Sequence, residues 1–288
     1  MTAEILALLT ALCFGAAATI TRTALNKHGS PFSAPVAFIS SAAIVWLIAL
    51  VNGYQLQADA AVLFTLRGML DPGLAALFIF VAFRNLGVAV TVPIIAASPI
   101  VATALSAVWL QESVTMAITI GTLLVLLGVV LLALQPQPHA SQISRKRFKH
   151  ILLALTGSGL IGIAAVVTKL ALNADNKPVE GLAISFTAAI AVQLIVTAVL
   201  SKWREVPKSF DSAKLFLASG LIVATGFLLS YLAFAQGKVS VVFPLMSTQP
   251  LFALLLSGIF LRKYESITKT VIAGAVLIVA GAATLTAF

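Results

Sequence analysis

Residues 82–134 read AFRNLGVAVTVPIIAASPIVATALSAVWLQESVTMAITIGTLLVLLGVVLLAL, and residues 233–286 read AFAQGKVSVVFPLMSTQPLFALLLSGIFLRKYESITKTVIAGAVLIVAGAATLT. The second stretch repeats the first in register, apart from two extra residues near position 263. Leucine and alanine match by chance in apolar sequence, whereas in-register matches of proline, glycine and charge indicate a duplicated unit. The aligned pairs are Pro93/Pro244, Pro99/Pro250, Glu112/Glu265, Gly121/Gly274 and Gly128/Gly281.

The beginning of each half repeats as well. Residues 15–26 align with residues 162–173, which places Thr21 on Thr168. The chain is therefore predicted to consist of two related halves. The division that we expect is a first unit at 1–138, a basic connector at 139–149 and a second unit at 150–288.

The composition excludes a water-soluble protein. The chain is 60% hydrophobic and 9% charged, with a mean hydropathy of +1.09, whereas a soluble domain carries about 25% charged residues. Because so few charges cannot cover a surface in water, lipid is the solvent for most of the chain. The single cysteine, Cys13, excludes an internal disulfide and a cysteine-based metal cluster.

Charge and turn clusters divide the chain into ten apolar segments. Each is close to the length of about 20 residues that a spanning helix needs. The connections are short, so neighbouring helices are expected to be antiparallel, and the fold class is an all-α membrane protein. The expected spans are 4–25, 32–52, 62–83, 88–110, 115–134, 150–172, 180–200, 212–235, 239–261 and 266–287.

The basic residues alternate between the two sides of the membrane. Of the 18 Lys and Arg residues, 14 lie in or beside the connections that follow odd-numbered spans, and cytoplasmic loops carry such an excess. We therefore expect a protein of the cytoplasmic (inner) membrane with both termini on the non-cytoplasmic side. The net charge of +9 then reflects loops rather than nucleic-acid binding. The cluster of basic residues at 145–147 is interpreted as an anchor to anionic membrane lipids.

Each half contains five spans, which is an odd number. The same pattern must then enter the membrane from opposite sides, so the halves are predicted to be inverted-topology repeats. Secondary transporters use this arrangement and place the substrate near the midplane between the repeats.

Asp71 lies about nine residues into the third span, which is roughly 14 Å of helix. An acid at that depth costs about 2.5–3.5 kcal/mol on insertion scales and normally faces a cavity or a partner. Arg67 lies one turn earlier on the same helical face. The pair is interpreted either as a site for substrate or for a coupling proton, or as an ion pair that neutralises itself. Pro72 is expected to bend the helix directly after Asp71.

Two prolines interrupt each of the fourth and ninth spans. A proline inside a helix frees a backbone carbonyl, which in lipid needs a neighbouring helix or a wet cavity. We therefore expect two bent helices that line a cavity. Ser98 and Gln249 precede the second proline of each pair, and they either supply hydrogen bonds to a substrate or hold helices together. The four prolines are Pro93, Pro99, Pro244 and Pro250.

Four other residues within the spans are candidates for contact with a substrate: Trp46, Gln193, Ser230 and Tyr231. Gln193 equally suits a hydrogen bond between helices, and a tryptophan near the end of a span, such as Trp46, is more often an anchor at the membrane interface. The paired glycines of the fifth and tenth spans indicate close helix packing, either within one chain or between the copies of a homodimer. A monomer and a homodimer both remain open.

No catalytic group is recognisable in the sequence. The three histidines lie in or beside loops, and no metal-ligand spacing, nucleotide-binding loop or Ser/His/Asp grouping is present. We therefore expect no enzyme, no bound metal and no cofactor.

With these features the chain resembles the drug/metabolite transporter superfamily, and within it the ten-helix EamA group. Two positions depart from the family pattern: Ile161 replaces an aromatic residue, and Asp71-Pro72 interrupts the third helix. The resemblance implies a basket-like bundle with a central cavity between helices 1, 3, 4, 6, 8 and 9, and structural caps or gates at Glu112 and Glu265. It rests on Phe14-Gly15 with Arg22, Gly162 with Lys169, Ala82-Phe83, Ala233-Phe234, Pro99, Pro250, Glu112 and Glu265.

Two function classes follow for this membrane protein. The first is a secondary transporter that moves small organic metabolites by alternating access, and the resemblance implies export of solutes such as amino acids. The second is a lipid-handling protein of the flippase or scramblase kind, or a receptor that transports nothing.

Overall fold

The computed structural model describes residues 2–28, 34–86, 88–133, 145–199, 210–260 and 269–287. All regular structure in these ranges is helical, because in lipid a helix pairs every backbone N–H and C=O within its own segment. The first half contains α1 (Ala3–His28), α2 (Ala34–Val51), α3 (Ala58–Gly68), η2 (Met69–Leu74), α4 (Ala75–Leu86), α5 (Val88–Ile95), α6 (Ser98–Trp109) and α7 (Met116–Ala133). The second half contains α8 (Arg145–Ala174), α9 (Pro178–Val199), α10 (Phe210–Gln236), α11 (Val239–Met246), α12 (Gln249–Phe260) and α13 (Lys269–Thr286).

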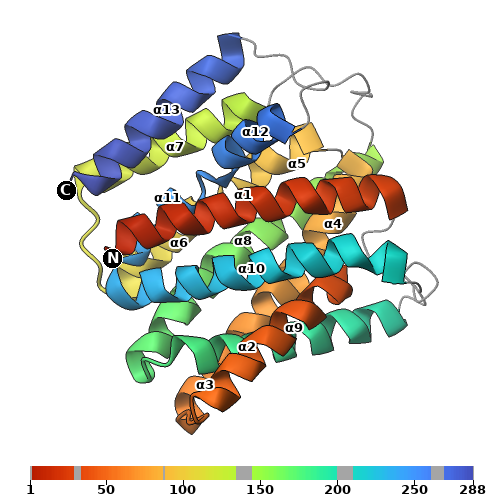
Figure 1. Ribbon diagram of the computed structural model, residues 1–288. Coiled ribbons are helices and arrows are strands. Elements are labelled where there is room, and N and C mark those ends of the chain that lie inside the picture. The colour runs from red at the N-terminus through yellow and green to blue at the C-terminus, as the bar shows by residue number, and fades with distance from the viewer. Residues whose placement is uncertain are drawn as a thin grey trace.

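These helices form ten spans. Eight apolar helical stretches are long enough to cross a bilayer, and two shorter ones lie in α2 and α7. The third span consists of α3, η2 and α4, the fourth of α5 and α6, and the ninth of α11 and α12. α8 begins at Arg145, five residues before the expected start of the sixth span. Both chain ends lie on one side of the bundle (Figure 1), as an even number of spans requires, and the predicted ten-helix fold is confirmed.

The two halves interleave in space. α1 packs along α10 of the second half, and α8 packs along the α3–η2–α4 span of the first half (Figure 1). Equivalent glycines make equivalent contacts across the two halves. Gly15 of α1 lies against the backbone of Gln249, and Gly162 of α8 lies against the backbone of Ser98. In the sequence repeat, Gly15 aligns with Gly162 and Ser98 aligns with Gln249, so the two contacts are equivalent. This exchange relates the halves by a pseudo-two-fold axis and confirms the two inverted five-helix repeats.

The fourth and ninth spans are interrupted just before their second prolines, between α5 and α6 and between α11 and α12. Pro99 has no N–H to donate to the carbonyl of Ile95, four residues earlier. The hydroxyl of Ser158 in α8 donates to that carbonyl instead, at 3.3 Å. A side chain of the second half thus satisfies a backbone group that a proline of the first half leaves without its helical donor.

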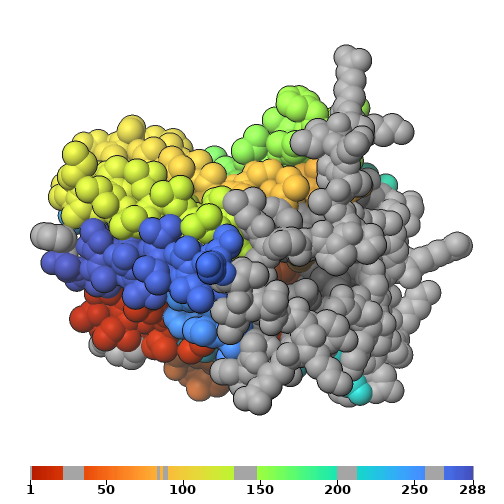
Figure 2. Space-filling model, turned by 90° about the horizontal axis from the view of Figure 1, so that it is seen from above, coloured from red at the N-terminus to blue at the C-terminus, as the bar shows by residue number. Residues whose placement is uncertain are grey.

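α7 and α13 pack antiparallel along a stripe of glycines. A Cβ atom added to Gly128 would lie 2.6 Å from the carbonyl oxygen of Gly274, and one added to Gly281 would lie 2.7 Å from that of Gly121. Only hydrogen atoms fit between the two backbones, which is the close approach that small residues allow. The two helices lie side by side on the surface (Figure 2). The glycine faces therefore meet within one chain.

Candidate substrate site at the break in the third span

The third span leaves helical geometry at its middle. Asp71 has φ −145° and ψ 124°, and Pro72 has φ −90° and ψ 17°. The peptide bond between them is cis, and the turn around them, Met69–Leu74, is π-helical. The proline has no N–H and cannot continue the helical ladder, so the chain is interrupted there. The break sets the Asp71 carboxylate off the regular helix, with its side chain 18% exposed.

Arg67 lies one turn before the break and is almost fully buried, with a relative exposure of 5%. Its Nη2 atom lies 3.5 Å from Oδ2 of Asp71. Its Nε donates to the hydroxyl of Thr168 in α8, at 3.3 Å. Its Nη1 atom is buried and has no hydrogen-bond partner. The guanidinium is therefore held at one end and shares a loose ion pair at the other.

The guanidinium lies over two aromatic rings of α10. The central carbon of Arg67 lies 4.8 Å from the ring centroid of Phe227 and 5.2 Å from that of Tyr231. Both distances are within the range of a cation–π attraction. The aromatic rings thus replace part of the hydration that Arg67 loses in the bundle.

Tyr231 is in turn fixed by a short chain of hydrogen bonds. Its phenol donates to the hydroxyl of Ser185 in α9 at 2.8 Å, and that hydroxyl donates to the backbone carbonyl of Phe64 at 2.8 Å. The Phe64 ring also stacks on the Tyr231 ring, with centroids 5.8 Å apart. Tyr231 is 0% exposed, so its ring is a rigid platform beside Arg67.

Gln193 of α9 supports the break from the other side. Its Nε2 donates to the carbonyl of Pro72 at 2.8 Å. The side chain is fully buried, and its Oε1 has no hydrogen-bond partner. Gln193 therefore joins two helices and still offers one free acceptor.

Seven side chains thus meet around the break, and we call them the Arg67 cluster. They belong to α3, η2, α8, α9 and α10, and so to both repeats. A buried ion pair such as Arg67–Asp71 contributes little net stability, but removing one partner costs about 3–5 kcal/mol. The cluster offers charge, donors and acceptors that can hold an ionised solute. Its members are Arg67, Asp71, Thr168, Ser185, Gln193, Phe227 and Tyr231.

The other candidate residues from the sequence lie in different surroundings. Ser98 is buried at the start of α6, and Gln249 is exposed at the start of α12. Trp46 donates its Nε1 proton to the hydroxyl of Thr187 at 2.9 Å, and so joins α2 to α9. Ser230 is buried, and its hydroxyl donates to the carbonyl of Phe227 in its own helix. Trp46 therefore joins two helices, as polar side chains in membranes commonly do, and Ser230 bonds within its own helix.

The sequence did not single out Thr168, Ser185 or Phe227. Thr168 carries a weak signal, because it aligns with Thr21 in the repeat. Ser185 and Phe227 carry none, since a serine or phenylalanine within an apolar span is common.

A second set of polar contacts joins the halves on the side of the N-terminus. Both carboxylate oxygens of Glu112 accept backbone hydrogen bonds at the start of α11, from Val239 at 2.7 Å and from Ser240 at 2.9 Å. Lys238 donates to the hydroxyl of Ser113 at 2.8 Å. Glu112 therefore caps a helix of the opposite repeat. Glu265, its counterpart, lies outside the described residues.

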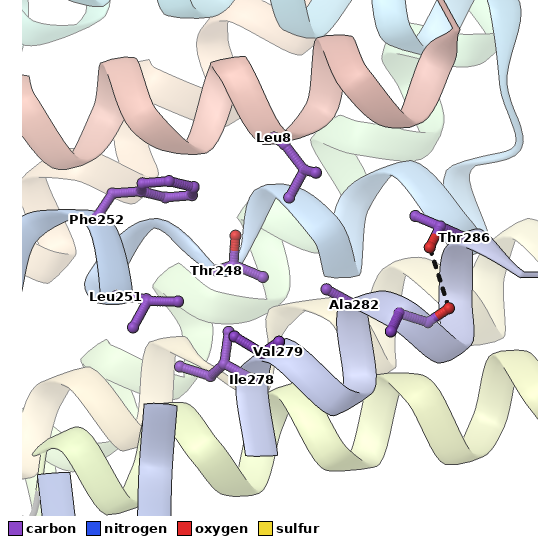
Figure 3. Close-up of a pocket in the computed structure, with 9 residues that line it drawn as sticks. Leu8, Thr248, Leu251, Phe252, Ile278, Val279, Ala282 and Thr286 are labelled. Atoms are coloured by element: carbon purple, nitrogen blue, oxygen red, sulfur yellow. Dashed lines mark hydrogen bonds between the residues drawn. The ribbon is translucent and has the colours of Figure 1, made fainter. Parts of the chain in front are cut away.

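An apolar groove of about 300 Å³ runs between α1, α12 and α13 (Figure 3). Its two threonines donate their hydroxyls to backbone carbonyls three residues earlier in the chain: Thr248 to Leu245 at 2.8 Å and Thr286 to Ala283 at 3.0 Å. The groove therefore offers almost no polar group to a solute and does not include the Arg67 cluster. Leu8, Leu251, Phe252, Ile278, Val279, Ala282 and Ala283 complete its wall.

A bundle of ten spans, built from two inverted repeats that interleave, is an architecture of membrane transporters. The chain belongs to the EamA-like transporter family, whose family model matches residues 1–134 and again residues 148–287. It is thus a multi-pass membrane protein of the drug/metabolite transporter type. No curated protein matches the chain.

A solved structure that carries only the description "Crystal structure of protein" shares the fold. The two chains superpose with a TM-score of 0.81 at 17% sequence identity, covering 99% of this chain and 96% of the other. At this identity the likeness concerns the fold alone.

Proposed function

We propose that the protein is a secondary transporter that exports small organic metabolites, such as amino acids, across the cytoplasmic membrane. The observation that carries this proposal is the Arg67 cluster, in which side chains of both repeats surround one charged pair at the middle of a broken span. Charged residues at that depth normally mark the path of a solute or an ion.

Alternating access is the mechanism that the interleaved halves support best. Two repeats that exchange equivalent contacts have two packings of similar free energy, related by the pseudo-two-fold axis. The Glu112 cap closes one such contact on the side of the N-terminus. If the Glu112 contact opens while the equivalent contact at the other end of the bundle closes, the Arg67 cluster is exposed to the two sides of the membrane in turn.

The orientation and the division of the chain belong to the same proposal. We place both termini on the non-cytoplasmic side, and the basic connector 139–149 between the two units on the cytoplasmic side. Reporter fusions at Phe288 and within the connector test this directly. Reporters that are active on the same side of the membrane would contradict it.

Asp71 is the group that we assign to proton coupling, for any solute that brings no ammonium group of its own. The groups around it are the guanidinium of Arg67, the phenol of Tyr231 and the uncharged side chain of Gln193. Lys169 of α8 is held elsewhere, because its Nζ donates to the carbonyl of Phe234 at 2.6 Å. Removing the charge in Asp71→Asn is expected to abolish the dependence of transport on a proton gradient.

The alternative, a lipid flippase or scramblase, has one observation in its favour, namely the apolar groove between α1, α12 and α13. A lipid also needs a polar site for its headgroup. Both threonine hydroxyls of the groove are already engaged by nearby backbone carbonyls. We therefore favour a solute over a lipid.

Counterflow in proteoliposomes tests the proposal. Vesicles that contain the protein are preloaded with mixtures of amino acids, sugars, nucleosides or cationic drugs, and uptake of each labelled solute is measured. We expect saturable uptake of at least one solute, and a loss of about tenfold or more in Asp71→Asn and Arg67→Gln. Asp59→Asn, at an exposed carboxylate in the first turn of α3, is the matched control and should transport normally. The absence of saturable uptake for every solute would refute transport.

A further inference from the structure

We infer that Arg67 recognises a carboxylate of the transported solute, and that the solute carboxylate takes the place of Asp71 on the guanidinium. This inference rests on the proposed transport function and deepens it, because it assigns the substrates to a chemical class. It starts from the hydrogen bonds that Arg67 does not make.

The guanidinium of Arg67 is only partly satisfied. Its Nε is committed to Thr168, but Nη2 meets Asp71 at 3.5 Å. A well-formed charge-assisted bond is about 2.7–2.9 Å long. Nη1 has no partner although it is buried. A buried donor is almost always paired in a protein, so Nη1 has donor capacity that a ligand can use.

The directions around Arg67 select how a ligand approaches. Phe227 and Tyr231 lie over the guanidinium at 4.8 and 5.2 Å, and Thr168 holds the Nε edge. The edge formed by Nη1 and Nη2 is the one that still has donor capacity. Two parallel donors in a plane match the two oxygens of a carboxylate.

The charge of the cluster also favours a solute with one carboxylate. Arg67 is the one cation of the cluster, and Lys169, which follows Thr168 in α8, is engaged by the carbonyl of Phe234. A single positive charge balances a monoanion, whereas a phosphate dianion would leave a buried negative charge without a partner. A cationic solute would meet the guanidinium as a like charge.

Displacement leaves Asp71 with a charge to neutralise. Two groups can do this: a proton taken from solvent onto its carboxylate, or an ammonium on the solute itself. Gln193 supports the second, because its free Oε1 acceptor lies on the residue that binds Pro72, next to Asp71. A carboxylate without an amine therefore binds together with a proton, and a zwitterion binds without one.

A rescue experiment with simple carboxylates tests the inference and does not require the transported solute itself. Asp71→Asn leaves Arg67 buried without its anion, so the detergent-purified variant should melt at a lower temperature than the wild type. Formate, acetate and propionate should restore its melting temperature in a concentration-dependent way. Chloride at equal ionic strength and acetamide should not. The double variant Arg67→Gln/Asp71→Asn should gain nothing from acetate, and Asp59→Asn should behave as the wild type does.

Two results would overturn the inference. One is a response to acetate that is equal in Asp71→Asn and in the double variant. The other is the absence of any response in Asp71→Asn. If that variant does not fold, the wild-type protein supplies the test: the solute found by counterflow is compared with its own primary amide, and the amide should bind about tenfold or more weakly. Transport of a solute that has no carboxylate would refute the inference and leave the proposed function standing. Transport of none would refute the proposed function, and the acetate experiment would still decide the role of Arg67.

Discussion

Arg67 shows how a single charged side chain is kept inside a membrane bundle. Its charge is spread over an ion pair with Asp71, a hydrogen bond to Thr168 and the faces of Phe227 and Tyr231. None of these contacts alone compensates for the water that the guanidinium loses. Phe227 and Tyr231 of α10 contribute beside the carboxylate, because their rings offer the cation large surfaces with few rotatable bonds.

The phenol of Tyr231 and its ring have separable effects. Tyr231→Phe removes only the hydrogen bond to Ser185, and we expect a loss of about 0.5–1.5 kcal/mol of stability. Tyr231→Leu also removes the ring that covers Arg67 and stacks on Phe64, so its loss should be clearly larger. Equilibrium unfolding of the two variants in detergent measures the difference. Equal losses would show that the ring contacts contribute nothing.

Gly128 and Gly159 form a matched pair of helical glycines. In Gly128→Ala the new Cβ would lie 2.6 Å from a backbone oxygen of α13, whereas in Gly159→Ala it would meet nothing within 4 Å. We expect Gly128→Ala to cost about 1–3 kcal/mol, because backbone cannot move aside. Gly159→Ala should be neutral or slightly stabilising, since alanine is the better helix former. Thermal unfolding that ranks the two variants the other way would contradict the close approach of α7 and α13.

At the scale of helices, the ten spans and their order could be predicted from the sequence. Runs of about 20 apolar residues leave no other stable structure in lipid. The breaks fall where Pro72, Pro99 and Pro250 remove backbone donors. Arg67, Asp71, Gln193 and Tyr231 could be named as candidates from the sequence, but their meeting in one cluster could not be predicted, because hydropathy does not specify which faces of two apolar helices meet. Ser185 and Gln193 come to the site from α9, which is distant from Arg67 in sequence.

Glu112 binds the start of α11 in the opposite repeat, and we expect this contact to govern opening on the side of the N-terminus. Glu112→Gln keeps one acceptor for the start of α11 but loses the negative charge that a helix N-terminus favours. We expect this end to open more often. A cysteine placed at Ser113, in a Cys13→Ser background, should then react faster with a membrane-impermeant maleimide than in the parent protein. Glu4→Gln, in the first turn of α1, is the control, and an unchanged rate in Glu112→Gln would exclude a gating role.

At the scale of the whole molecule, the longest helix contacts of each repeat are with the other repeat. α1 packs along its length against α10, and the third span packs along its length against α8. We therefore expect residues 1–138 or 150–288 to be degraded when expressed alone. Co-expression of the two pieces should give a complex that purifies together and unfolds cooperatively. A stable, monomeric half would contradict the interleaved arrangement.

The glycine stripe between α7 and α13 has a mechanical consequence. Two backbones in direct contact have no flexible side chains between them to absorb sliding. We therefore expect α7 and α13 to move as one unit while the remaining helices rock. Spin labels on α7 and α13 should therefore keep one fixed separation in every state of the transport cycle, while pairs placed across the rest of the bundle change theirs.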